Sequence, residues 1–346
     1  MKLGDFNIDG NRRAFIIAEI AQAHEGSLGL AHSYIDAVAD AGADAIKFQT
    51  HIASEESTID EGFRVKMSGQ DRSRWDYWKR MEFSKAQWQS LVEHSRERGL
   101  VFMSSAFSIE AVKLLDELGV DGWKVGSGEF FNQKLISEMV LRGGPILLST
   151  GLANTNEIDT IHNFLMGASA DFSFFQCTTS YPVSLSKVGL NVLPFLKKRY
   201  VCPVGLSDHS GTVYPILMAM ANSVDFIEAH VVFDKRMYGP DTSSSITLDQ
   251  LKFIVDANRA FETLRMSPVD KNIMAPELAG LKDLFTKSVC LKNDLKSGAV
   301  LTKDDLTLKK PGTGIPAEQI ESLIGRSLVR DVSSNRLLQW SDLLPN

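Results

Sequence analysis

Cysteine is scarce in this chain, and a long apolar run is absent. The three cysteines, Cys177, Cys202 and Cys290, are widely spaced and match no metal-finger pattern. An odd, sparse count suits a reducing cytosol. No stretch approaches the roughly 18 apolar residues of a membrane span, so we expect no membrane partner. The opening MKLGDFNIDGNRR is polar and carries no signal-like segment, and we therefore expect a cytoplasmic protein.

The chain also has no excess of basic over acidic residues. Lysine and arginine total 37 against 43 aspartates and glutamates, a formal net charge of −6. Nucleic-acid binding needs a basic face, so we expect no nucleic-acid partner. The balance does not exclude an anionic small substrate, because local lysines and arginines decide its binding. The 346 residues, 44% hydrophobic and 23% charged, are typical of a globular protein of about two domains.

Short apolar, β-prone runs alternate with helix-like segments along the chain. The predicted strands are Phe15–Ile20, Ala45–Gln49, Leu100–Ser105, Gly122–Val125, Pro145–Thr150, Phe172–Thr178, Cys202–Ser207 and Phe226–Val231. The predicted helices include Leu28–Ala41, Ser84–Arg98, Ile109–Leu118, Gln133–Leu141, Asn154–Leu165, Thr212–Asn222 and Thr247–Leu264. Eight alternations match a (β/α)8 barrel. An open doubly wound sheet is the alternative, but no G-x-G-x-x-G follows the first strand.

Two segments interrupt the alternation. Residues 60–83 form a charged, aromatic-bearing insertion after the second strand, which either covers a catalytic mouth or is a surface excursion. Beyond the barrel, predicted over residues 1–265, residues 266–286 read as a linker with a short helix. Turn signals such as Pro311–Gly314 then recur, which predicts a separate small domain over 287–346. A domain of this size has a marginal core, so we expect it to dock on another surface.

Polar side chains gather at the carboxyl ends of the predicted strands, where barrel enzymes hold their catalytic residues. Residues two apart in a strand share a face, so Lys47 pairs with Gln49 and Glu228 with His230. Buried lysines require anionic partners, and hydroxyls beside them form a cradle for phosphate or carboxylate. The remaining members of this set are Glu19, Ser105, Lys124, Ser127, Ser149, Ser207 and His209.

The histidines of this set have two readings. His209 and His230, near a carboxylate, can bind a divalent metal with water completing the shell. Either one alone is more simply a hydrogen-bonded structural histidine, but their place at adjacent strand ends favours the metal. Lys124 as a Schiff-base lysine is a minority alternative, because metal ligands would be redundant beside it. His24 and His51 follow the first two strands and border the predicted site. His32, His94 and His162 fall in helical segments, where surface or packing roles are expected.

A series of motifs resembles one family, the sialic acid synthases, which condense phosphoenolpyruvate into nonulosonates. The motifs are IIAEIAQAHEGS, AIKFQTH, VFMSSAFS, WKVGSGE, PILLSTG, CTTSYP, VGLSDHSG and EAH with the later GPD, and they follow one another along nearly the whole chain. LKKPGTGI resembles the antifreeze-like (SAF) domain of that family. The resemblance implies a TIM barrel followed by a small β-rich SAF domain. It also implies a domain-swapped homodimer in which the small domain caps the active site of the other subunit.

The resemblance implies a role for each residue that matches a motif. The metal ligands fall on His209 and His230, and Mn2+ is the expected ion, with Mg2+ or Co2+ as alternatives. The phosphoenolpyruvate-binding residues fall on Lys47, Ser105, Lys124, Ser127, Ser149 and Ser207. The catalytic and acid/base group falls on Glu19, Gln49, Glu228 and Asp241, and the sugar-binding residues on Thr179, Tyr181 and Lys310.

Several positions depart from the family pattern. Ser105 stands where many members have threonine, and Thr179 where some have asparagine. Lys310 stands where an arginine reaches from the capping domain toward the N-acyl group, and lysine cannot reproduce that planar fork. The segment PDTSSSITLDQL differs from the PDHKASLEP of the relatives. The resemblance therefore identifies the reaction better than the sugar.

The implied reaction joins phosphoenolpyruvate to the open-chain aldehyde of an N-acetyl hexosamine, such as N-acetylmannosamine. Carbon 3 of the enol attacks the aldehyde, water adds at carbon 2 and phosphate leaves, which yields a nine-carbon 2-keto sugar acid. A diacetamido hexose leading to legionaminic or pseudaminic acid is the alternative acceptor. A phosphorylated sugar is less favoured, because the loops offer no second basic cluster beyond Arg72-Ser73-Arg74 and Lys79-Arg80. A carbohydrate-binding protein built on the small domain would leave the buried charged residues without a role.

Overall fold

The computed structural model describes residues 1–8, 10, 13–65 and 69–345, so residues 66–68 of the predicted insertion lie outside the described residues. The chain divides into two compact units, Met1–Met266 and Ser267–Asn346. Each unit is described by itself.

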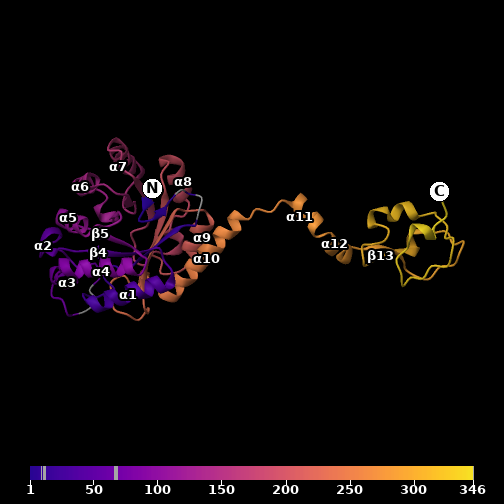
Figure 1. Ribbon diagram of the computed structural model, residues 1–346, viewed down its shortest axis with the longest axis horizontal. Helices are drawn as coiled ribbons and strands as arrows, with labels where there is room; N and C mark the ends of the chain where they lie inside the picture. Colours follow the sequence, from indigo (N-terminus) through magenta and orange to yellow (C-terminus); the bar gives the residue numbers. More distant parts are fainter. Residues whose placement is uncertain (9, 11–12, 66–68, 346) are drawn as a thin grey trace. The chain divides into compact units, whose positions relative to one another are not determined.

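Eight parallel strands form a closed barrel in the first unit (Figure 1). The ring closes because β10 is hydrogen-bonded both to β9 and to β3. The strands are β3 (Phe15–Glu19), β4 (Ala45–Thr50), β5 (Val101–Ala106), β6 (Trp123–Val125), β7 (Ile146–Ser149), β8 (Phe172–Cys177), β9 (Val204–Asp208) and β10 (Phe226–Val232). The predicted (β/α)8 barrel is therefore confirmed.

Helices follow the strands and cover the outside of the barrel (Figure 1). They are α1 (Leu28–Ala41), α4 (Lys85–Glu97), α5 (Ile109–Leu118), α6 (Gln133–Arg142), α7 (Thr155–Gly167), α8 (Val192–Tyr200), α9 (Tyr214–Ala221) and α10 (Leu248–Met266). Side-chain caps fix many of their starts, as Ser27 does for α1 and Ser108 for α5. Helix α8 has no predicted counterpart, and its N-cap residue, Asn191, makes no side-chain cap hydrogen bond.

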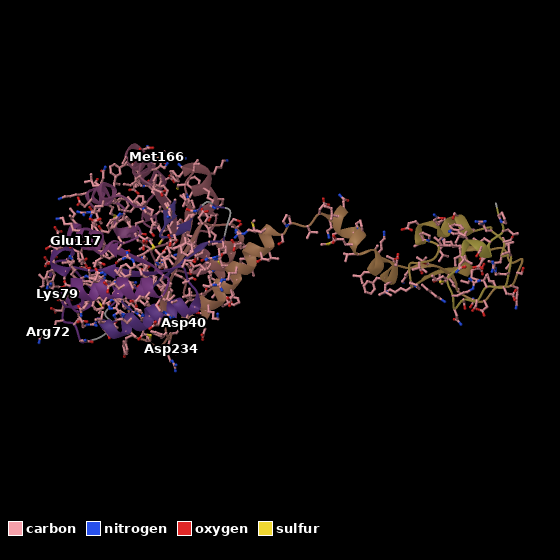
Figure 2. All side chains as sticks on the ribbon, viewed as in Figure 1. Asp40, Arg72, Lys79, Glu117, Met166 and Asp234 are labelled. Carbon is pink, nitrogen blue, oxygen red and sulfur yellow. The ribbon has the colours of Figure 1, made fainter. Side chains whose placement is uncertain are left out.

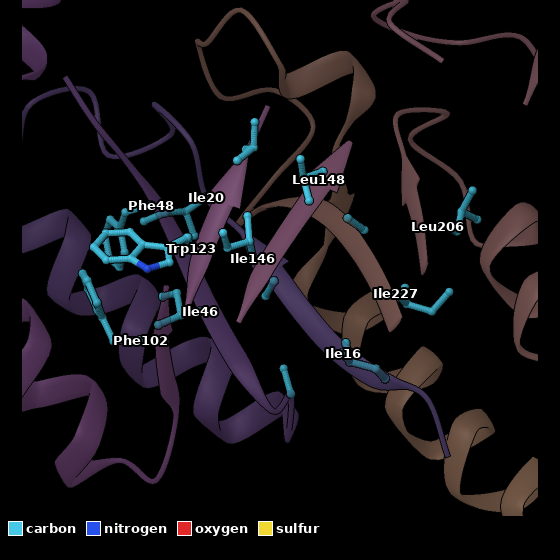
Figure 3. Packing of buried hydrophobic residues seen from close by; sticks show 14 of the residues in the cluster. Ile16, Ile20, Ile46, Phe48, Phe102, Trp123, Ile146, Leu148, Leu206 and Ile227 are labelled. Carbon is cyan, nitrogen blue, oxygen red and sulfur yellow. The ribbon is translucent and has the colours of Figure 1, made fainter. Parts of the chain in front are cut away.

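The outward faces of the strands pack against these helices. Figure 3 shows Ile46, Ile146 and Leu148 projecting from the strands into this layer, where all three are fully buried. Since side chains alternate along a strand, the intervening residues point into the barrel. This alternation separates a hydrophobic outer layer from the inner faces that carry the site.

An apolar plug seals the amino-terminal end of the barrel. Hairpin β1 (Lys2–Leu3) and β2 (Phe6–Asn7) brings Leu3 against inward residues of the strands, including Phe175 and Phe226. Gly205 faces these rings, and a Cβ there would lie 2.6 Å from Phe175 and 2.8 Å from Phe226, so only glycine fits. The interior is therefore closed at this end, and its polar residues lie at the carboxyl ends of the strands.

Two short helices follow β4: α2 (Ala53–Glu56) precedes the predicted insertion and α3 (Arg74–Met81) lies within it. They share a small apolar cluster of their own. Strand β11 (Ile246–Thr247) extends the sheet beside β10. The second unit holds α11 (Lys271–Glu277), α12 (Ala279–Phe285) and the antiparallel pair β12 (Ser288–Leu291) and β13 (Leu306–Lys309). It has a separate core around Val289, Leu301 and Leu338. Among the described residues, no helix has the length and apolarity needed to cross a membrane.

Candidate active site

A polar cavity of about 370 Å³ opens at the carboxyl ends of the barrel strands. All predicted site residues of the barrel line it, and each strand residue among them points inward. They are Glu19, Lys47, Gln49, Ser105, Lys124, Ser127, Ser149, Thr179, Tyr181, Ser207, His209, Glu228, His230 and Asp241. Lys310 belongs to the second unit, where its Nζ lies 5.2 Å from the ring centre of Phe285. The structure thus brings the barrel residues together, and their individual roles stay predictions.

Two lysines and two glutamates form the floor of the cavity. Lys47 Nζ lies 2.9 Å from Glu19 and 3.5 Å from Glu228, while Lys124 Nζ lies 3.4 Å from Glu228. All four side chains are at most 4% exposed. Glu228 is therefore shared by two ammonium groups, which leaves Lys124 with the weaker compensation for its burial.

The pKa shifts of the floor follow this unequal pairing. Burial opposes the charge of Lys47, but Glu19 and Glu228 outweigh it and hold the pKa of Lys47 above its usual value. Burial would also raise the pKa of Glu19, yet Lys47 and His230 hold it well below its usual range. For Lys124 burial prevails and lowers the pKa, since Glu228 offsets it only in part. A further anion beside Lys124 would relieve this cost.

Three serine hydroxyls bind the charged floor residues. Lys47 donates to Ser105 at 3.3 Å, Lys124 donates to Ser149 at 2.6 Å, and Ser207 donates to Glu228 Oε1 at 2.8 Å. These three hydroxyls therefore belong to the polar floor. Ser127 differs, because its hydroxyl accepts a hydrogen bond from the Gly151 amide at 3.1 Å.

The two oxygens of the Glu228 carboxylate face different lysines. Oε2 is buried and faces Lys47 Nζ at 3.5 Å, with no closer hydrogen-bond donor among the described residues. Oε1 faces Lys124 Nζ at 3.4 Å. Glu228 therefore bridges the two ammonium groups of the floor.

Two imidazoles line the cavity from adjacent strands. The ring centres of His209 and His230 lie 5.2 Å apart, and Tyr181 covers His209 at 4.3 Å. Burial, with repulsion from His230 added, lowers the pKa of His209 to about 3, so this ring is neutral near pH 7. His230 Nε2 lies 3.6 Å from Glu19.

These donors fit a divalent ion that is bound only partly by protein. Imidazole nitrogen is an accepted ligand for Mn2+ and its neighbours, and a neutral ring is the form that binds. No group of three or more His, Cys, Asp or Glu side chains among the described residues is placed to enclose a metal. Water and substrate would therefore complete the coordination of an ion on His209 and His230.

The mouth of the cavity also holds Arg64, which the sequence did not single out, and Arg74, which it named only within the basic segment Arg72-Ser73-Arg74. From the insertion, Arg64 Nη2 lies 2.6 Å from Asp241 Oδ1, and its guanidinium lies 4.5 Å from the ring centre of Tyr181. Arg74 is 3.2 Å from Glu61 and lies over Trp78. The insertion thus forms a wall of the cavity, as one of its two interpretations predicted.

His51 belongs to the cavity as well. Its ring is stacked between Trp78 at 4.0 Å and Phe107 at 4.6 Å, and its Nδ1 lies 2.6 Å from Glu56. On its other side, Nε2 lies 2.9 Å from the Gln22 amide, which also donates to Gln49. Gln49 in turn donates to Glu19 at 2.7 Å. A line of hydrogen bonds therefore joins α2 to the floor, and Trp78 of the insertion covers the His51 ring.

The other histidines lie outside the residues that line the cavity. His24 is buried against Phe83, so it stands behind the wall rather than on it. His32 and His94 contact one another between α1 and α4, with 2.9 Å between their Nδ1 atoms. His162 packs on Phe172 and Tyr200. The packing roles expected for the three helical histidines agree with these contacts.

Comparison with known proteins gives two family matches and close relatives of similar length. Residues 34–269 match the NeuB family, and residues 286–344 match the SAF domain. The N,N'-diacetyllegionaminic acid synthase of Campylobacter jejuni is 30% identical over 95% of this chain and 99% of its own. The human N-acetylneuraminate-9-phosphate synthase is 30% identical over 95% of this chain and 92% of its own. The crystal structure of the N-acetylneuraminic acid synthetase of Leptospira borgpetersenii, in complex with citrate, is 28% identical, with a TM-score of 0.71, and the match covers 81% of this chain and 96% of that one.

Proposed function

This chain belongs to the NeuB family and carries a SAF domain, and from that premise we propose that it is a nonulosonate synthase. It condenses phosphoenolpyruvate with the open-chain form of an N-acetyl hexosamine, N-acetylmannosamine or a relative, and water. The products are a nine-carbon 2-keto sugar acid and phosphate. The synthases among its relatives, which are named for legionaminic and neuraminic acids, support this reaction class.

The burial of Lys124 is the observation that carries the proposal. Its side chain is 2% exposed, its pKa is lowered by burial, and its nearest carboxylate is shared with Lys47. Phosphoenolpyruvate brings a carboxylate and a phosphate, which are the groups that two buried lysines and their serine neighbours bind. The anion stabilises the charged form of Lys124 when it binds.

The chain's own groups then act on a bound enol. Lys47, Lys124 and Ser149 hold the anionic end of phosphoenolpyruvate, so that carbon 3 faces the mouth. Cationic character develops at carbon 2 when carbon 3 attacks the aldehyde, and the Glu228 carboxylate is placed to stabilise it and to take a proton from the incoming water. The bond between carbon 2 and the ester oxygen then breaks, and phosphate leaves with that oxygen. A divalent ion on His209 and His230 supplies a Lewis acid for the aldehyde oxygen when bound.

The charges that line the mouth support an uncharged acceptor. Among the described lining residues, six carboxylates face four lysine and arginine side chains. Arg64 and Arg74 are each paired with a carboxylate, Asp241 and Glu61. A sugar phosphate would have to compete with those carboxylates, so it is the less favoured acceptor. A diacetamido hexose is neutral and stays the alternative.

Three further assignments belong to the proposal. Thr179 and Tyr181 contact the sugar from the loop after β8, and Asp241 with Gln49 binds its hydroxyls. Mn2+ is the expected ion. The active form is a homodimer in which Lys310 of one chain acts at the barrel of the other.

A phosphate-release assay tests the function. Purified protein receives phosphoenolpyruvate, Mn2+ and one acceptor at a time: N-acetylmannosamine, a 2,4-diacetamido hexose, or N-acetylmannosamine 6-phosphate, with mannose as the control lacking an acylamino group. We expect release only with an unphosphorylated acylamino sugar, loss on chelation and recovery with Mn2+. Release with none of the acceptors contradicts the proposed function, and release with the 6-phosphate alone supports the rival acceptor.

A further inference from the structure

Arg64 is the residue through which the insertion reaches the acceptor side of the cavity. Its side chain is 39% exposed and lines the same cavity as the floor residues. It meets two segments far away in the sequence, the loop after β8 at Tyr181 and the loop after β10 at Asp241, which is 177 residues distant. These two contacts fix the position and the orientation of the Arg64 guanidinium in the mouth of the cavity.

Contacts through the Tyr181 ring set the distance of Arg64 from the two cavity histidines. Its guanidinium carbon lies 4.5 Å from the ring centre of Tyr181, and Tyr181 lies 4.3 Å from His209 and 6.1 Å from His230. The Tyr181 ring therefore separates the Arg64 guanidinium from His209 and His230, the proposed metal ligands. Since the lysines occupy the floor at the opposite end, Arg64 faces the part of the cavity left for the second substrate.

The ion pair of Arg64 determines the kind of group that it binds. Asp241 accepts from Nη2 at 2.6 Å, and the Pro240 carbonyl accepts from the same nitrogen at 3.3 Å. The carboxylate neutralises the guanidinium, so its remaining N–H donors suit a neutral oxygen better than a phosphate. Guanidinium donors are rigid and planar, and this makes them selective for the position of such an oxygen.

We propose that Arg64 is a specificity-determining residue that donates a hydrogen bond to a neutral oxygen of the acceptor sugar, either its acyl carbonyl or one hydroxyl. This inference rests on the proposed function, because it assumes an acylated hexose as the second substrate. Tyr181 supports the guanidinium from below, and Asp241 holds it in place.

Steady-state kinetics of Arg64→Ala and Arg64→Lys test the proposal. A lost hydrogen bond from a charged donor corresponds to about tenfold or more in binding, so we expect the acceptor KM to rise by at least about tenfold in both variants. The phosphoenolpyruvate KM should change less than about twofold. Arg72→Ala is the matched control, since Arg72 is an exposed arginine of the same insertion that projects from the periphery of the unit (Figure 2).

A series of acceptors separates recognition from a merely structural role. The series holds the active sugar, its free-amine analogue and analogues that each lack one hydroxyl. If Arg64 binds an acceptor oxygen, the penalty of Arg64→Ala disappears for the one analogue that lacks this oxygen. If Arg64→Ala raises KM equally for every analogue, or leaves the acceptor KM unchanged, the inference is wrong. The proposed function still stands in that case, because the wild type is active. A wild type that turns over no acceptor overturns the proposed function and this inference together.

Discussion

Glu228 joins two buried ammonium groups, and its two oxygens have different environments. Oε1 accepts a hydrogen bond from Ser207 and faces Lys124, whereas the buried Oε2 faces Lys47. This carboxylate offsets the lysines in the free protein, and in the proposed mechanism it also stabilises positive charge during the reaction. Removing the charge of Glu228 should therefore affect phosphoenolpyruvate binding and turnover in different ways.

Glu228→Gln should therefore separate the two. Removing the charge leaves both lysines in greater need of an anion, so phosphoenolpyruvate binding should stay the same or tighten. Turnover should fall by at least about a hundredfold, because the amide cannot take a proton or stabilise a cation. Calorimetric titration and phosphate release measure the two quantities, and a weaker affinity for phosphoenolpyruvate would contradict the assignment.

His51 is predicted to position the floor rather than to react. It links Glu56 to Gln22 and Gln49, and Gln49 holds Glu19. His51→Phe keeps a ring between Trp78 and Phe107 but removes the hydrogen bonds. We expect a lower thermal midpoint, because the buried Glu56 side chain loses its hydrogen-bond partner. At a temperature where the variant is folded, we also expect a tenfold or larger fall in kcat/KM, from loss of orientation. His162→Phe is the control, since that ring also packs on aromatic neighbours but lies outside the cavity; equal activity of both variants would refute the positioning role.

At the scale of the element, local pattern predicted the strands and the residues that face inward. The two-residue period placed Lys47 with Gln49 and Glu228 with His230, and the structure puts these pairs on one face. Helices α1 and α5 begin and end where their apolar spacing predicted, because caps and spacing are local signals. The position of Arg64 could not be predicted in this way, since its partner Asp241 is 177 residues away and the insertion has no periodic pattern. The type of a residue in a loop does not predict which distant loop it will contact.

The terminal hairpin is a second element that the sequence did not reveal, because β1 and β2 are only two residues each. Leu3 is fully buried beneath the barrel, so Leu3→Ala should cost about 2–5 kcal/mol of unfolding free energy. Chemical unfolding followed by the fluorescence of the buried Trp88 and Trp123 measures the barrel unit. The control Leu141→Ala, at a side chain 81% exposed, should shift the free energy by less than about 0.5 kcal/mol. A Leu3→Ala protein as stable as this control would show that the hairpin does not seal the barrel.

At the scale of the whole molecule, the second unit has its own core but no catalytic cluster that the sequence identified. The proposed homodimer gives it a function through Lys310, one of the two lysines directly before Pro311. Mixing Lys310→Ala chains with Lys124→Met chains should then restore activity, since one of two sites in each mixed dimer keeps both lysines. At acceptor concentrations below KM we expect up to about a quarter of the wild-type rate.

Two controls make the mixing experiment decisive. The first control is Lys296→Ala, at a lysine 88% exposed in the same unit. This variant should have wild-type activity by itself, without being mixed with another variant. Subunit exchange is verified with differently tagged chains. Exchanged dimers whose activity is no greater than that of the separate variants would place Lys310 at the barrel of its own chain or away from any site.

Titration calorimetry with Mn2+ and no acceptor measures whether the buried lysines of the barrel floor bind phosphoenolpyruvate. Lys124→Met keeps the length of the side chain and removes its charge, while Lys198→Met, at an exposed lysine of α8, is the control. Thermal midpoints verify that both variants are folded. We predict that wild type and Lys198→Met bind phosphoenolpyruvate equally, and that Lys124→Met binds it at least about a hundredfold more weakly. A folded Lys124→Met protein that binds phosphoenolpyruvate as tightly as the wild type would contradict the account.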